Sequence, residues 1–200
     1  MQSLRPTLFV LLLIASTSSY SQEFLRYQIN WGDDSIGMIE ARREIKDNGE
    51  THYVINSSSS FRVVFKFHLT FDYFCSYKGD SLIKASAIRK MNGNEKERSW
   101  TTFEEDKYRI FVDGKELDTP DQDIGYSISM MYFTEPAPGC QRVFSERFGE
   151  NIPVEKEGTK SYKLSLPNGY SNVYNYGEDG ICQSVDVETR WADLRFHLVD

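Results

Sequence analysis

Apolar and polar residues alternate over long stretches of the chain, most clearly from 61 to 77. All nine odd-numbered positions of this stretch are apolar, and six of the eight even-numbered positions are polar. A period of two is typical of a β-strand with one buried side and one solvent-facing side. Shorter alternations occur at 25–31, 162–166, 170–176 and 192–198. The pattern predicts a mainly β protein of about ten strands.

Tight-turn sequences separate several of these predicted strands. They are Asp-Asn-Gly at 47–49, Asn-Gly-Asn at 92–94, Asp-Gly at 113–114 and Pro-Asn-Gly at 167–169. Asn-Gly and Asp-Gly are favoured in two-residue hairpins because both positions must adopt positive φ. Neighbouring strands should therefore pair in an antiparallel meander.

The stretch 61–77 also predicts curvature if it forms one strand. Seventeen residues would then span about 56 Å, whereas a compact chain of this length is only ~41 Å wide. Such a strand must coil around the core or break at a bulge. We therefore predict that residues 22–200 form a single domain, a curved antiparallel sheet in an open (half) or closed barrel.

Residues 120–133 depart from the two-residue period and predict one helix. The segment opens with Thr-Pro-Asp-Gln at 119–122, a capping box with proline at the first helical position. Apolar residues then recur at helical spacing as far as Tyr132, and Pro136 follows. We expect the apolar stripe of this helix to pack against the concave face of the sheet.

The first 21 residues have the order of a signal peptide. Arg5 precedes the apolar run 8–15, and small and polar residues lead to Ser21. Eight apolar residues are too few for a transmembrane helix, which needs ~20. We predict cleavage between Ser21 and Gln22 and export to the periplasm or the extracellular medium. The remaining chain should be soluble, because it has no second apolar stretch that could cross a membrane.

Charge and motif content exclude several classes of function. The formal net charge is −7, and because Arg5 is the only charged residue of the leader, the rest of the chain has 22 basic and 30 acidic residues. An acidic chain without a basic run is a poor partner for nucleic acid. No metal or cofactor is expected, because the three histidines lack metal-ligand spacing and no phosphate-binding motif is present. The sequence does not specify an oligomeric state.

The three cysteines allow one disulfide at most. Cys75 falls on the apolar phase of its strand, which predicts a small buried side chain. Cys140 and Cys182 both follow turn sequences, so they are the preferred pair if a bridge forms, closing a loop worth about 4 kcal/mol. Three free thiols are an equally good reading of the sequence.

Glu135, Glu146 and Arg147 lie in aromatic surroundings that could shift their pKa values. The simpler interpretation is structural, in which these residues form ion pairs that stabilise the corner after the predicted helix. The alternative is catalytic, because a pair of carboxylates can hydrolyse a glycosidic bond.

Three motifs give the chain a family resemblance. They are Tyr-Phe-x-Glu-Pro at 132–136, Phe-Ser-Glu-Arg-Phe-Gly at 144–149 and Leu-Pro-Asn-Gly at 166–169. Together with the exported N-terminus, they resemble an uncharacterised family of exported bacterial all-β proteins, a domain of unknown function. The resemblance implies a secreted or periplasmic all-β protein with no known catalytic residues. The predicted architecture is also similar to periplasmic lipoprotein carriers and lipocalin-like proteins.

These observations favour a non-enzymatic protein that binds an apolar small molecule or lipid in the hollow of the sheet. Three alternatives stay open: aromatic side chains that simply fill the core, a carboxylate-dependent glycan hydrolase, and an envelope scaffold or interaction module. The candidates to line the hollow are apolar residues of the long strand and of the predicted helix: Phe65, Phe67, Phe71, Ile128, Met131 and Tyr132.

Overall fold

A computed structural model describes residues 22–62, 65–120, 123–190 and 193–200. The predicted signal peptide, including Ser21, lies outside these described residues, and Gln22 is the first residue of the first strand. Fourteen strands and one short 3₁₀ turn account for most of the described chain. The elements are β1 Gln22–Trp31, β2 Asp34–Ile45, β3 Glu50–Arg62, β4 Lys66–Lys78, β5 Ser81–Met91, β6 Asn94–Glu104, β7 Lys107–Val112, β8 Lys115–Leu117, the 3₁₀ turn η1 Met130–Tyr132, β9 Arg142–Ser145, β10 Glu150–Gly158, β11 Ser161–Ser165, β12 Ser171–Tyr176, β13 Cys182–Val187 and β14 Leu194–Leu198.

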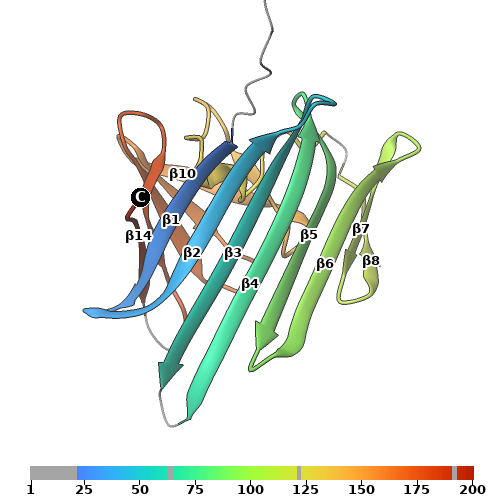
Figure 1. The fold of residues 1–200 in the computed structure, drawn as a ribbon. Helices are drawn as coiled ribbons and strands as arrows, with labels where there is room; N and C mark the ends of the chain where they lie inside the picture. The colour runs from blue at the N-terminus through green and yellow to red at the C-terminus, as the bar shows by residue number, and fades with distance from the viewer. Residues whose placement is uncertain (1–21, 63–64, 121–122, 191–192) are drawn as a thin grey trace, which may run out of the picture.

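All fourteen strands belong to one antiparallel sheet, in the order β8-β7-β6-β5-β4-β3-β2-β1-β14-β13-β12-β11-β10-β9. The sheet folds back on itself, so that β1–β8 form one arm and β9–β14 the other, joined through the β1–β14 pair (Figure 1). Its two end strands, β8 and β9, do not pair with each other. The prediction of a mainly β antiparallel sheet is confirmed, and of the two predicted forms, open or closed, the sheet has the open one; the expected number of about ten strands was too low.

The predicted turn sequences lie where the chain reverses. Those at 47–49, 92–94, 113–114 and 167–169 connect β2 to β3, β5 to β6, β7 to β8 and β11 to β12. The long strand expected at 61–77 is instead a hairpin, in which β3 ends at Arg62 and β4 begins at Lys66.

The alternation passes through this hairpin because of its register. Odd-numbered residues of β3 pair with odd-numbered residues of β4, as in Phe61 with Phe67 and Ser59 with Leu69. Paired residues of an antiparallel sheet point to the same face. The two-residue pattern therefore continues across the turn without a change of phase, and it cannot reveal that the chain reverses.

The helix expected at 120–133 is wrong. Residues 121–122 lie outside the described part of the chain, and the rest of the segment contains only the η1 turn and an isolated bridge from Ser127 to Phe144. We call residues 123–134 the strap. Its backbone is hydrogen-bonded to distant strands: the N–H of Leu82 donates to the carbonyl of Ile124, and the N–H of Ile128 donates to the carbonyl of Phe144. These bonds take the place of the i to i−4 bonds of a helix.

The helical spacing in the strap marks the residues that it buries. Ile124 is 2% exposed, Met131 is fully buried, and Tyr132 is 7% exposed. They join a core built from both arms, which includes Tyr27 of β1 and Leu164 of β11. The helical spacing therefore identified residues of this segment that are buried, although the backbone that presents them is not helical.

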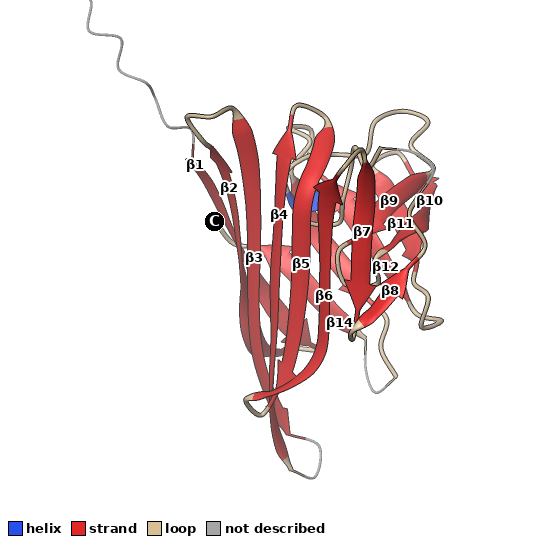
Figure 2. Ribbon diagram, turned by 90° about the vertical axis from the view of Figure 1, so that its right-hand side faces the viewer, coloured by secondary structure: helices blue, strands red, loops and turns tan. Residues whose placement is uncertain are grey.

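The strap and one turn seal the gap between the two ends of the sheet. The N–H of Phe144 in β9 donates to Tyr126, so the strap is bonded both to the start of β5 and to the edge strand β9. The turn between β9 and β10 packs directly on the other arm, where the Ser99 hydroxyl donates to the Glu146 carbonyl at 2.5 Å. Figure 2 shows the two arms from the side of this gap.

Gly149 is the point of closest approach across the gap. Its φ is +67°, and a Cβ placed there would lie 2.7 Å from Ile110 Cγ2 and 2.9 Å from Val112 Cγ2, both on β7. These side chains belong to the opposite arm, so the absence of a side chain at Gly149 allows the arms to meet.

We predict that Gly149→Ala destabilises the fold more than Gly93→Ala does. Both glycines have positive φ, so each alanine carries a backbone cost of roughly 1–2 kcal/mol. Only Gly149 is crowded, because no atom lies within 4 Å of a Cβ built on Gly93. The crowding should add about 1–3 kcal/mol, measured by denaturant unfolding. Equal losses in the two variants would contradict the contact between the arms.

Candidate binding cavity

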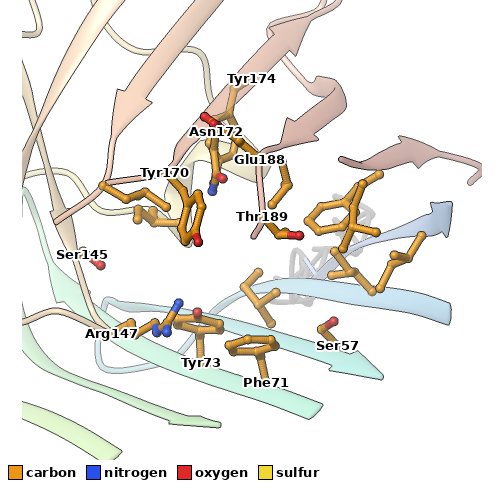
Figure 3. A pocket seen from close by; sticks show the side chains of 18 of the residues that line it. Ser57, Phe71, Tyr73, Ser145, Arg147, Tyr170, Asn172, Tyr174, Glu188 and Thr189 are labelled. Carbon is orange, nitrogen blue, oxygen red and sulfur yellow. The ribbon is translucent and has the colours of Figure 1, made fainter. Parts of the chain in front are cut away.

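A cavity of about 290 Å³ lies between the two arms. One side is formed by β1–β4, and the opposite side by β12–β14 with the turn that precedes β12 (Figure 3). The cavity exists because the sheet folds back without its facing side chains meeting everywhere. Its position inside the bend of a curved sheet is typical of small-molecule sites.

Most of the cavity is lined by aliphatic and aromatic side chains. Ile29 and Phe196 are paired across β1 and β14, and Leu194 lies next to them at the start of β14. Ile39 of β2 and Ile55 of β3 continue this lining on the N-terminal arm. The bend of the sheet is therefore the apolar end of the cavity.

The other end of the cavity is polar and is centred on Arg147. Figure 3 shows Arg147 and Tyr73 side by side on one wall, with Tyr170 reaching toward them from the opposite wall. Ser145, just before Arg147, and Ser129 of the strap also line the cavity. The hydroxyl of Ser129 has no hydrogen-bond partner within the described part of the chain, although the residue is only 1% exposed.

Arg147 is held in place by one carboxylate and two rings. Its Nε donates to Glu97 Oε2 at 2.6 Å, and Glu97 Oε1 accepts from Arg89 Nη2, also at 2.6 Å. The guanidinium lies 4.8 Å from the ring centroid of Phe148 and 5.7 Å from that of Phe71. Burial opposes ionisation of Glu97, but its bonds to the two arginines outweigh burial and lower its pKa.

Glu146 is buried behind the polar end of the cavity. It is fully buried, and its Oε1 accepts a hydrogen bond from the N–H of Ser129 at 2.9 Å. Its Oε2 has no partner among the described residues. Cys75 and Ser127 complete this cluster, with Sγ and Oγ 3.6 Å apart. Burial favours the neutral acid and raises the pKa of Glu146. The hydrogen bonds from Ser129 act in the opposite direction but do not outweigh burial.

The structure brings together three of the six residues predicted to line the hollow. Phe71, Ile128 and Tyr132 line the cavity. Met131 is fully buried in the core and does not reach the cavity.

The other two predicted lining residues lie elsewhere. Phe65 is 73% exposed just before β4, and Phe67 stacks on Phe61 with ring centroids 5.6 Å apart. Both belong to the hairpin that the unbroken alternation conceals and precede Leu69, the first residue of β4 that lines the cavity.

Glu146 and Arg147 do not form an ion pair with each other, because Arg147 binds Glu97 and Glu146 points into the buried cluster. Glu135 does form one, with Lys160 Nζ at 3.3 Å, and it accepts a hydrogen bond from the Tyr162 hydroxyl at 2.7 Å. Glu135 lines a separate groove beside 136–141. The two carboxylates therefore do not face one cleft, as glycoside hydrolysis requires.

All three cysteines are free thiols, so the possible bridge between Cys140 and Cys182 is not formed. Cys75 is buried as predicted. No cluster of three or more metal-ligating side chains occurs in the part of the chain that the structure describes. None of the helical segments within the described ranges is long and apolar enough to span a membrane.

A family model for a domain of unknown function, DUF6134, matches residues 27–199. The chain belongs to the DUF6134 family. This confirms membership of an uncharacterised domain family, and the three motifs at 132–136, 144–149 and 166–169 all lie inside the matched range. No curated protein matches this DUF6134 chain.

The DUF6134 fold is similar to a solved structure, a β-barrel-like protein of the domain of unknown function DUF1849 from Brucella abortus. The TM-score is 0.56, and the match covers 88% of this chain and 95% of the other at 11% sequence identity. At that identity the likeness concerns the fold alone. It supports the description of the DUF6134 sheet as an open barrel.

We predict that Glu146→Gln removes a pH dependence of stability. The folded-state pKa of Glu146 is raised, so its contribution is fully present below the unfolded-state pKa of about 4.3. It is lost as pH rises through the folded-state value, by up to about 1.4 kcal/mol per pH unit. The free energy of unfolding of the variant, measured in urea, should therefore gain on the wild type as pH rises from about 4 toward neutrality.

Glu135→Gln provides a control of opposite sign. The Tyr162 hydrogen bond, helped by Lys160, lowers the pKa of Glu135, so its contribution is present at neutral pH and is lost on acidification. Parallel stability curves for the wild type and Glu146→Gln would show that Glu146 is not held as a neutral acid.

Proposed function

We propose that the protein is an exported, non-enzymatic binding protein that holds an apolar or lipid-like molecule in the cavity between its two arms. The signal-peptide pattern of residues 1–21 supports export. The binding function is supported above all by the cavity itself, whose volume of about 290 Å³ lies at the lower end of the ~300–1,000 Å³ usual for ligand sites.

The composition of the lining supports an apolar ligand. Ile29, Ile39 and Phe196 present aliphatic and aromatic surface to the space, and apolar residues are the majority of the lining. Ligand sites are typically apolar with a small number of placed polar groups. Transfer of an apolar molecule from water into this cavity is favoured by roughly 25 cal/mol per Å² of surface removed from water.

The likeness to the DUF1849 protein supports the barrel-like fold that the proposal needs, but it does not identify a ligand. The glycan hydrolase reading has less support, since Glu135 is ion-paired beside a separate groove and Glu146 is fully buried. A packed core without a ligand has less support because the cavity is present, and an envelope scaffold or interaction module is the other alternative.

We predict that protein purified from its own host carries a bound molecule. A native mass spectrum should show a mass excess over the denatured spectrum of the same sample, and solvent extraction should release the extra component. Identical native and denatured masses, obtained after purification without detergent, would contradict a tightly bound ligand.

We predict that Leu194→Trp blocks the cavity. Leu194 is half-buried at the start of β14 and lines the space, so an indole there would occupy it. Affinity for the uncharged fluorescent probe N-phenyl-1-naphthylamine should fall roughly tenfold or more, a loss of about 1.4 kcal/mol or more.

Met38→Trp is the matched control for this test. Met38 lies on β2, is 39% exposed and does not line the cavity, so its replacement should leave probe affinity unchanged. Equal probe binding by the wild type and both variants would place the probe outside the cavity.

A further inference from the structure

The polar end of the cavity carries one positive charge in excess. Glu97 is the single carboxylate that binds both Arg89 and Arg147. Two guanidinium groups therefore share one negative charge. Arg147 uses its Nε for Glu97, and the guanidinium borders the cavity with only 24% of its side chain exposed. Arg89 does not line the cavity.

The orientation of Arg147 is fixed before any ligand arrives. The rings of Phe71 and Phe148 lie within 6 Å of its guanidinium, and Glu97 holds its Nε. A preorganised guanidinium can form short, charge-assisted hydrogen bonds to a carboxylate or phosphate. It loses less side-chain entropy on binding than a free arginine would.

Further hydrogen-bonding groups surround the guanidinium. Tyr73 lies next to Arg147, and Tyr170 points toward both from the opposite wall (Figure 3). Ser129 and Asn172 also line the cavity, although the Ser129 hydroxyl and the Asn172 side-chain carbonyl are themselves buried. A polar headgroup at this end would therefore meet a charged group with tyrosine side chains beside it.

The apolar end lies across the sheet from Arg147. Arg147 packs on Phe71 of β4, whereas Ile29 and Phe196 belong to β1 and β14. Three strand spacings separate β4 from β1, roughly 14 Å at ~4.8 Å per spacing. The cavity thus has a charged end and an apolar end, which is the polarity of an amphiphile.

The size of the cavity limits the apolar part to one chain. A volume of about 290 Å³ lies just below the ~300–1,000 Å³ usual for small-molecule sites. A cavity of this size favours one hydrocarbon chain over the two chains of a phospholipid.

We infer that the ligand is a single-chain amphiphile with an anionic headgroup, bound with its headgroup at Arg147 and its chain directed toward the β1–β14 bend. This inference rests on the proposed binding function and adds a ligand class to it. Glu188 is the acidic residue of the lining; its carboxylate accepts a hydrogen bond from the Ser171 hydroxyl at 2.9 Å, on the wall opposite Arg147.

Competition against N-phenyl-1-naphthylamine tests the headgroup. The competitors are dodecanoate, 1-dodecanol and dodecyltrimethylammonium, which share one chain length and differ in headgroup charge. They are used below their micelle-forming concentrations at mildly alkaline pH. Wild-type protein should bind dodecanoate roughly tenfold more tightly than dodecanol, and the cation most weakly. Acetate and inorganic phosphate should not compete, because they lack the chain.

Three arginine variants separate the effect of the headgroup contact from an effect on the fold. Arg147→Gln should bind dodecanoate and dodecanol equally, and Arg147→Lys should keep part of the preference for the anion. Arg89→Gln leaves the cavity lining intact but makes the Arg147–Glu97 pair neutral, so it should keep only part of the preference. Circular dichroism and denaturant unfolding establish that each variant is folded.

The possible failures are distinguishable. If wild-type protein binds dodecanoate and dodecanol equally, or if Arg147→Gln keeps the anion preference, the headgroup assignment is overturned while the binding function stands. Competition by acetate or phosphate alone would overturn the amphiphile and indicate a simple anion site. If neither the probe nor any of the three amphiphiles binds, the proposed function itself is overturned.

Discussion

The structure depends on a hydrogen-bonded ladder that bends back on itself but does not close. From β8 to β9 each strand is paired with its neighbours, and the two end strands face a gap. A closed barrel would seal its interior with backbone bonds, whereas this sheet must seal it with packing. The strap and the close approach at Gly149 do this at one end of the gap. Ile128 and Tyr132 of the strap and Arg147 and Phe148 of the turn before Gly149 also line the cavity, so the elements that cover the gap help to form the candidate binding cavity.

Short turn sequences were sufficient to predict several of the tight turns between strands. Asn-Gly and Asp-Gly sequences correctly mark four chain reversals. Both turn residues have positive φ at 92–93 and 113–114, whereas at the other two turns only Gly49 and Gly169 do. The reversal after Arg62 has no comparable signal in the alternation, since its register preserves the phase. Composition and period therefore predicted the fold class but undercounted the strands.

The strap shows why the prediction of a helix at 120–133 was wrong. The capping sequence and apolar spacing of the strap fit a helix. The backbone of the strap instead bonds to Leu82 and Phe144, and these distant partners cannot be predicted from the sequence of the segment itself. Tertiary context overrides a weak helical preference, which Gly125 already lowers. The apolar spacing still identified buried residues correctly, because burial depends on which side chains face the core and not on the backbone that carries them.

The site was predictable only in its apolar half. Phe71 and Tyr132 follow from periodicity, whereas the role of Arg147 depends on Glu97, fifty positions earlier and on the other arm. An arginine between Phe144 and Phe148 was the available signal, and it was interpreted as a local pair with Glu146. The alternation at 170–176 also marked the opposite wall of the cavity, although none of its residues was assigned to the site.

The short end strands have a consequence for assembly. An open sheet normally offers unpaired backbone groups that recruit strands from other molecules, the first step toward fibrils. Here β8 has only three residues, two of them the exposed and charged Lys115 and Glu116. At β9 the amide and carbonyl of Phe144 are already occupied by the strap. The sheet can thus stay open without presenting, at either end strand, a template for aggregation.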